Sequence, residues 1–207
     1  MREPYFQTGF LRLCWQKLFW LIVWNLLFLL CCLPVVTAPA ATTALACVCQ
    51  GMLLEEPRLF RRFFRSFRQN FLPSLPLGLL FLAGPAALLY GCVFYRQAAQ
   101  GDGPAVVLSI FCLICVYLLF CMGAFAFQML ARVELKTAAV IRNSFYLTFR
   151  QPGTVLGWEL LAFAIPAAMW LTLPYSLPLI LLLGASLPCF TAARGILPLI
   201  DTLIRKE

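Results

Sequence analysis

The sequence predicts an all-α membrane protein, a polytopic bundle of about six spanning helices with further amphipathic helices on the cytoplasmic side. Of its 207 residues, 63% are hydrophobic and only 12% are charged, and the mean hydropathy is +0.91. A soluble chain of this size could not bury so much apolar surface, so lipid must be its solvent. The polar intervals are shorter than a soluble domain, and residues 1–207 are therefore expected to form a single membrane domain.

Six apolar stretches come close to the length of about 20 residues that a spanning helix needs. They lie near residues 18–36, 37–54, 74–95, 105–131, 153–174 and 178–199. The second stretch is the weakest, because it contains Thr37, Pro39, Thr42 and Gln50. The sequence leaves open whether it crosses fully or forms half of a re-entrant hairpin.

Basic residues indicate the orientation, because Lys and Arg in short loops mark the cytoplasmic face. They cluster before the first stretch, after the second, after the fourth and at the C-terminus, whereas Arg96 alone falls on the opposite side. This asymmetry predicts a multi-pass protein with both termini in the cytoplasm. A cleaved signal peptide at residues 1–40 is a rival interpretation, but the apolar stretch is too long and too rich in Trp.

The most distinctive segment, near residues 57–71, is predicted to be an amphipathic helix that begins at Pro57. Aromatic residues recur on one face at helical spacing, and arginines occupy the other face. Such a helix is typical of contact with anionic lipid headgroups at the membrane surface. The residues expected at this interface are Arg58, Arg61, Arg62, Arg65, Arg68, Phe60, Phe63, Phe64 and Phe67. A weaker basic segment near residues 135–150 shares its Ser-Phe-x-x-x-Phe pattern and predicts a second amphipathic helix.

Polar residues inside the apolar stretches predict a polar layer in the inner leaflet, because charged groups in spans normally face the bundle interior. Glu159 and Arg194 are expected at matching depths and could form a pair. Asn25, Gln50 and Gln128 are expected near the same depth. The layer is either a structural clasp or a cytoplasm-facing site for a polar ligand or partner segment.

Several function classes are disfavoured by the residues present. The chain has no histidine, and its spans contain no paired carboxylates or phosphate-binding glycine loop, so we expect no catalytic residues and no enzyme activity. Most of the ten cysteines lie inside apolar runs, where they act as small apolar side chains, and we expect no metal site and no cofactor. The net charge of +8 is distributed as topology signals, so nucleic acid is not an expected partner.

Asn25-Leu26, Leu33-Pro34-Val35-Val36-Thr37, a nearby Pro-Ala and the Phe–Arg segment from Leu59 to Phe71 resemble the YesL-like family of bacterial membrane proteins. The resemblance covers roughly residues 18–75, and Ala38 stands where many members have Gly before the Pro-Ala. It implies a location in the bacterial plasma membrane and a family of unknown biochemical function that is suspected of helping carbohydrate uptake. No site residue can be transferred from it.

Two functions remain open on the sequence. One is an accessory or assembly partner of a membrane transport system, for example a sugar transporter complex. The other is a transporter or permease component that itself moves a small solute. Helices interrupted by prolines such as Pro166 and Pro188 favour the second function, whereas sparse polar chemistry fits the first equally well.

Overall fold

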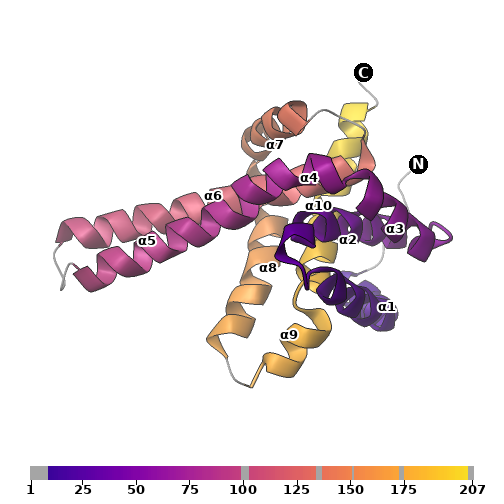
Figure 1. The fold of residues 1–207 in the computed structure, drawn as a ribbon, viewed down its shortest axis with the longest axis horizontal. Coiled ribbons are helices and arrows are strands. Elements are labelled where there is room, and N and C mark those ends of the chain that lie inside the picture. The colour runs from indigo at the N-terminus through magenta and orange to yellow at the C-terminus, as the bar shows by residue number, and fades with distance from the viewer. Residues whose placement is uncertain (1–8, 99–102, 134–136, 151, 173–174, 205–207) are drawn as a thin grey trace.

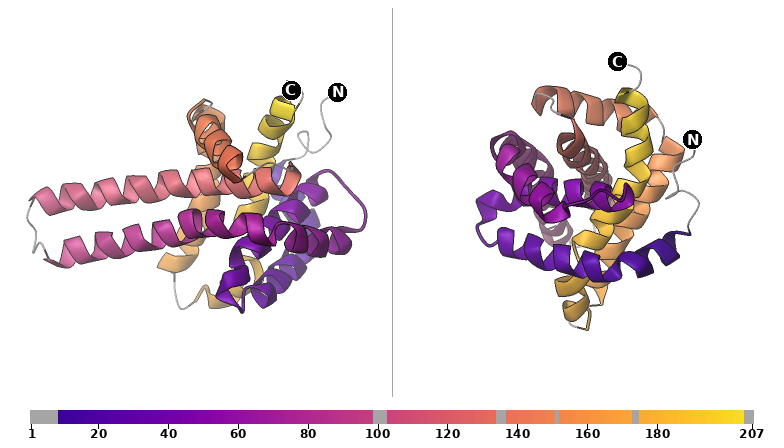
Figure 2. Two further views of the ribbon diagram at one scale, coloured as in Figure 1. Left: turned by 45° about the horizontal axis from the view of Figure 1, so that its top comes forward. Right: turned by 90° about the vertical axis from the view of Figure 1, so that its right-hand side faces the viewer.

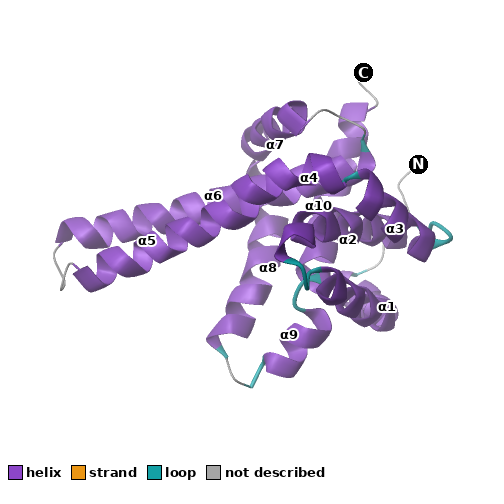
Figure 3. Ribbon diagram, in the orientation of Figure 1, coloured by secondary structure: helices purple, strands orange, loops and turns teal. Residues whose placement is uncertain are grey.

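The structure is a computed structural model that describes residues 9–98, 103–133, 137–150, 152–172 and 175–204. Within these ranges every regular element is a helix, which confirms the predicted all-α class (Figure 3). In chain order they are α1 Phe10–Cys31, a 3₁₀ turn Val35–Thr37, α2 Ala38–Leu53, α3 Leu59–Gln69, α4 Phe71–Gly78, a π-helical turn Leu79–Ala83, α5 Gly84–Ala98, α6 Gly103–Arg132, α7 Thr137–Arg150, α8 Pro152–Leu171, α9 Leu177–Leu183 and α10 Ser186–Ile204.

Four helical stretches in the described residues are long and apolar enough to cross a membrane: Arg12–Cys31, Val35–Leu53, Phe71–Gln97 and Val106–Arg132. A fifth is obtained if α9 and the first part of α10, which meet at an angle of 48°, are counted as one broken span. The apolar part of α8, Gly157–Met169, is shorter. All six predicted stretches are therefore helical, and the sixth is interrupted.

Helix α2, the weakest predicted span, lies at the centre of the fold. All of its residues except Ala38 and Thr42 are buried, and it packs against α1, α3, α4, α6 and α10. Its side chains are mostly Ala, Thr, Cys and Gly, which let neighbouring helices approach closely. At 1.5 Å per residue its 16 residues span only about 24 Å. Enclosure by protein explains why this helix tolerates more polar residues than the others.

The α5–α6 hairpin is the most extended part of the molecule. Helix α4, the π-helical turn and α5 follow one another as one long rod, and α6 returns beside it, so that the pair projects away from the other helices (Figures 1 and 2). Beyond the body of the protein the two helices contact each other, and their outward apolar side chains are uncovered, as at Tyr90 and Phe111, which are 75% and 61% exposed.

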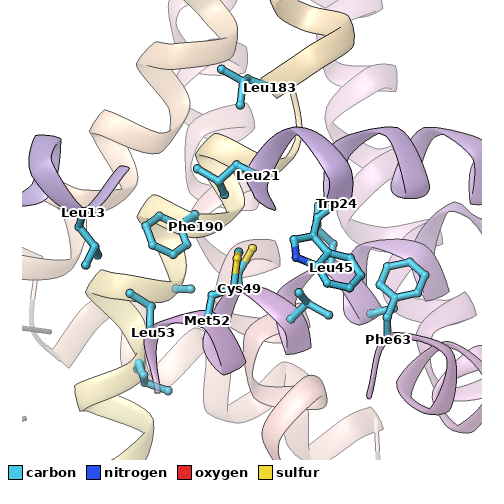
Figure 4. Close-up of a cluster of buried hydrophobic side chains, with 14 of the residues drawn as sticks. Leu13, Leu21, Trp24, Leu45, Cys49, Met52, Leu53, Phe63, Leu183 and Phe190 are labelled. Atoms are coloured by element: carbon cyan, nitrogen blue, oxygen red, sulfur yellow. The ribbon is translucent and has the colours of Figure 1, made fainter. Parts of the chain in front are cut away.

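Two apolar clusters hold the helices together. The first joins α1, α2, α3, α9 and α10 around Trp24, Leu45, Phe63 and Phe190, all fully buried (Figure 4). The second joins α4, α6, α7, α8 and α10 around Leu77, Phe125 and Ile196. Helices α6 and α10 pack against α2 and against each other.

Candidate functional site

The break between α9 and α10 is spanned by the side chain of Asn25 on α1. The Nδ2 atom of Asn25 donates to the carbonyl oxygen of Leu181 at 2.8 Å and approaches that of Ile180 at 3.5 Å. Its Oδ1 atom accepts from the backbone N–H groups of Ala185 and Ser186, both at 2.9 Å. A broken helix leaves backbone groups without their usual partners, and in an apolar interior these must be satisfied by other groups. Asn25 supplies both kinds of partner and so stabilises the 48° bend.

A second polar contact joins the three central helices α2, α6 and α10. Gln50 on α2 donates through Nε2 to the side-chain and backbone oxygens of Gln128, at 2.7 and 2.8 Å. Gln128 on α6 donates in turn to the carbonyl oxygen of Cys189 at 3.2 Å. Cys189 lies three residues beyond Ser186, about 4.5 Å along α10. The structure therefore brings Asn25, Gln50 and Gln128 to the same end of α10.

Between these two contacts lies a cavity of about 300 Å³. Its walls come from α1, α2, the π-helical turn, α6, α8 and the α9–α10 break, and they include Phe28, Phe81, Phe120 and Phe127. Thr42, Gln128 and Cys189 are its polar members. The Thr42 hydroxyl already donates to its own helix at Ala38, at 2.8 Å. The cavity is consequently apolar, with few hydrogen-bonding groups left to meet an occupant.

The π-helical turn brings Phe81 to this cavity. Pro85 has no amide hydrogen to donate to the carbonyl of Phe81 four residues earlier, which favours a widened turn at this point. Gly123 of α6 faces it, and a Cβ atom there would lie 2.9 Å from the Cβ of Phe81. Widened turns often occur at functional sites. This one lines the same cavity as the break between α9 and α10.

Glu159 and Arg194 do not form the pair that the sequence predicted. Glu159 is fully buried, and neither carboxylate oxygen has a hydrogen-bond partner among the described residues. It lies near Tyr117 and Cys121 of α6. The guanidinium carbon of Arg194 instead lies 5.5 Å from the ring centroid of Trp158, and Cys14 of α1 is nearby. Adjacent residues of a helix point about 100° apart. Glu159 and Trp158 therefore lie at nearly the same depth but face different directions, and it is Trp158 that faces Arg194.

The aromatic face of α3 packs largely against protein. Phe63 is completely buried and stacks on Trp24 at 5.9 Å, and Phe60 lies 4.6 Å from the same ring. Phe67 is half-buried, whereas Phe60 and Phe64 keep about half of their surface exposed. The helix also begins later than predicted: Pro57 precedes it, and Arg58 adopts a left-handed conformation with a φ of 59°. Two positive φ values, at Glu55 and Arg58, make the tight turn from α2 into α3.

The five arginines of this segment fall into two groups. Arg58, Arg61 and Arg68 are exposed and do not line the cleft beside α6, whereas Arg65 is exposed and does line it. Arg62 forms an ion pair with Glu56 across the turn, and with Arg65 it faces the C-terminal end of α6. The predicted contact with anionic lipid is thus geometrically open to the first group, whereas Arg62 and Arg65 take part in a cleft described below.

The fold and these sites define an all-helical membrane protein whose central helix α2 is enclosed by α1, α3, α4, α6 and α10. Residues 21–92 match the family model described as "Protein of unknown function, DUF624". YesL-like proteins belong to that family, so the match confirms the resemblance seen in the sequence. The matched segment runs from α1 into α5 and includes Asn25, Gln50 and α3. No curated protein and no solved structure matches the chain.

Sequence reasoning missed the cavity and most of its lining. Pro166 and Pro188 were recognised as helix interruptions, and both line it. The π-helical turn at Phe81 has no comparable sequence signal apart from Pro85. The sequence also did not indicate that Gly184 is required at the α9–α10 break. In the structure, a Cβ atom at this position would lie only 2.5 Å from the carbonyl oxygen of Ile180.

Proposed function

We propose that this protein is a multi-pass plasma-membrane protein, with both termini in the cytoplasm, that acts as an accessory or assembly partner of a membrane transport system. The observation that carries this proposal is the projecting α5–α6 hairpin, whose apolar side chains the rest of the chain leaves uncovered. A large contiguous apolar surface is typical of contact with lipid or with a partner's helices. A rigid hairpin that extends beyond its own body is well suited to reach such a partner.

The chemistry of the central cavity supports an accessory role over direct carriage of a sugar. A sugar has many hydroxyl groups, and a site that binds one needs several hydrogen-bonding partners. The cavity offers mainly phenylalanine rings, and its Thr42 and Gln128 already bond to protein. Any link of this chain to carbohydrate uptake would therefore act through the partner that binds the sugar.

The second candidate function is a transporter component that itself moves a small solute. The observation that favours it is the position of the cavity, between a π-helical turn and a broken helix. Discontinuous helices commonly form solute sites in transporters. The apolar lining would select an apolar solute.

A photo-crosslinking experiment in the native membrane tests the accessory role. A photoreactive phenylalanine analogue is placed at Tyr90 or Phe111 on the hairpin, and as a control at Leu171 or Leu179, which are also exposed but lie on α8 and α9. We expect the hairpin positions to crosslink to a subunit of a transport protein, identified by mass spectrometry, and the control positions to crosslink mainly to lipid. Hairpin positions that crosslink only to lipid would contradict the proposal.

Uptake into proteoliposomes that contain this protein alone distinguishes the two candidates. The accessory function predicts no uptake of labelled sugars or of apolar solutes. Uptake of an apolar solute that is abolished by filling the cavity, for example with Gly123→Leu, would establish the second candidate instead.

A further inference from the structure

A polar cleft of about 420 Å³ lies between α3 and the C-terminal end of α6. It is separate from the apolar cavity and has no lining residue in common with it. One wall is formed by residues 130–132 at the end of α6 together with Val133, and the other by α3. Cys47 of the buried helix α2 also lines the cleft. A cleft that reaches the central helix is deeper than the flat basic face expected of a surface helix.

The α3 wall is one continuous stripe of the helix. Arg62, Arg65, Ser66 and Gln69 follow at helical spacing and therefore share a face. Asn70 completes the wall, and its Nδ2 atom donates to the Ser66 hydroxyl oxygen at 3.1 Å. Phe63 lies beside this stripe on α3, and its burial against Trp24 fixes the rotation of the helix. The aromatic packing thus determines which arginines face the cleft.

Positive charge lines the cleft. Arg62, Arg65 and Arg132 are among its lining residues, and the other lining residues within the described part of the chain are neutral. Glu56 pairs with Arg62 but is not a lining residue. Arginine side chains that line a polar cleft favour an anionic occupant, because charge-assisted hydrogen bonds to a guanidinium are stronger than neutral ones. Of the five arginines in the segment 57–71, only Arg62 and Arg65 line the cleft, and Arg58, Arg61 and Arg68 lie outside it.

We propose that this cleft is a binding site for a phosphate ester, held by Arg62, Arg65 and Arg132, with Ser66, Gln69 and Asn70 as hydrogen-bonding partners. Arginine forks bind phosphate oxygens in pairs, and a tetrahedral phosphate presents oxygens toward guanidinium groups in several directions, whereas the two oxygens of a carboxylate lie in one plane. The volume exceeds that of a phosphate group alone and leaves room for the alcohol to which it is attached. That alcohol is either the glycerol of a lipid headgroup or a soluble metabolite.

Calorimetric titration of the full-length protein in neutral detergent tests the site. One arm uses dihexanoyl phosphatidylglycerol, with dihexanoylglycerol as the lipid that lacks phosphate. The other arm uses glycerol 3-phosphate and inorganic phosphate. Binding in the lipid arm alone identifies a headgroup site, and binding in the soluble arm identifies a metabolite site. Binding of dihexanoylglycerol as tightly as phosphatidylglycerol, or of none of the phosphate compounds, would overturn the proposal.

Matched variants separate the cleft from general surface charge. Arg65→Gln and Arg132→Gln are each expected to weaken binding about tenfold, because each removes one charge-assisted contact. Arg96→Gln carries the same change of charge at an exposed position on α5, outside both the cleft and the predicted lipid interface, and is expected to bind like the unmodified protein. Arg65 is exposed, so its replacement should leave the fold intact, which the unfolding midpoint without ligand checks. Equal weakening by all three variants would show that the charge acts non-specifically and would refute the site.

Discussion

The amide nitrogen of Asn25 lies 2.8 Å from the carbonyl oxygen of Leu181, a residue 156 positions further along the chain. Through this contact and the bonds to Ala185 and Ser186, one side chain on the first helix holds the bend in the last span. The stability of the broken span therefore depends on α1.

We expect Asn25→Leu to lower the stability of the protein in detergent by about 2 kcal/mol. The substitution keeps the side-chain size but leaves buried backbone groups of the α9–α10 break without partners. Thermal unfolding monitored by circular dichroism measures the loss. Thr42→Val is the control, because the Thr42 hydroxyl bonds only within its own helix, and it should change the midpoint little. An unchanged midpoint for Asn25→Leu would contradict the assigned role.

A double-mutant cycle should detect coupling between Gln50 and Gln128. The two side chains share a hydrogen bond of 2.7 Å inside the fold, and such contacts in membrane proteins average about 0.6 kcal/mol. The cycle compares the unfolding free energies of Gln50→Leu, Gln128→Leu and the double variant. Strictly additive losses would show that the bond contributes nothing to stability.

Glu159→Leu is expected to stabilise the protein. The carboxyl oxygens are buried and lack a hydrogen-bond partner in the described structure, which is unfavourable compared with an apolar side chain of similar size. The unfolding midpoint should rise, and the effects of Glu159→Leu and Arg194→Gln should add, because the two side chains face different helices. A fall in the midpoint would mean that Glu159 has a stabilising partner. If the unfolding midpoint of Glu159→Leu rises but the variant no longer functions in cells, the carboxyl group is retained for function and not for stability.

Gly78 and Gly157 provide a paired test of helix packing. A Cβ atom at Gly78 would lie 2.1 Å from the Pro39 ring, whereas one at Gly157 would meet nothing within 4 Å. Gly78→Ala should therefore separate α4 from α2 and lower the midpoint. Gly157→Ala should leave it unchanged or raise it slightly, because Ala favours a helix more than Gly does. Equal effects of the two changes would argue against the close α2–α4 contact.

Cysteine labelling tests the predicted orientation. Cys14 is half-buried, so introduced cysteines at Gly9 and Gly103 are better probes, since both positions are exposed and have open space around a Cβ atom. In a background without the reactive native thiols, an impermeant maleimide should label Gly9→Cys from the cytoplasm and Gly103→Cys from outside. Labelling of both positions from one side would refute the predicted topology.

The helices were predictable because apolar length and basic islands are local features of the sequence. The helical α3 segment, the α5–α6 pair and the apolar stretches all follow from such features. The central position of α2 was not predictable in the same way, since Thr42 and Gln50 made it appear marginal as a span. Its neighbours supply the contacts that its own hydropathy does not predict.

The sequence identified the residues of the polar layer, but it predicted only some of the contacts among them. Depth along a helix correctly grouped Gln50 with Gln128, because both lie near the cytoplasmic ends of their predicted spans. Depth alone failed for Glu159 and Arg194, because pairing also requires the two residues to face each other around the helix axis. The contact of Asn25 with the last span depends on a tertiary crossing of α1 and α9, which no local pattern reveals.

The enclosure of α2 has a consequence for how the protein is made. This helix emerges from the ribosome early, but four of its neighbours, α3, α4, α6 and α10, are synthesised after it, and α10 is the last of these. Until α10 arrives, Gln50 and the threonines of α2 lack part of their final surroundings. A chain that stalls or is truncated before α10 would thus present an incompletely covered polar helix within the bilayer, a feature that membrane quality-control proteases can recognise. Biogenesis of the whole protein therefore depends on completing its last helix.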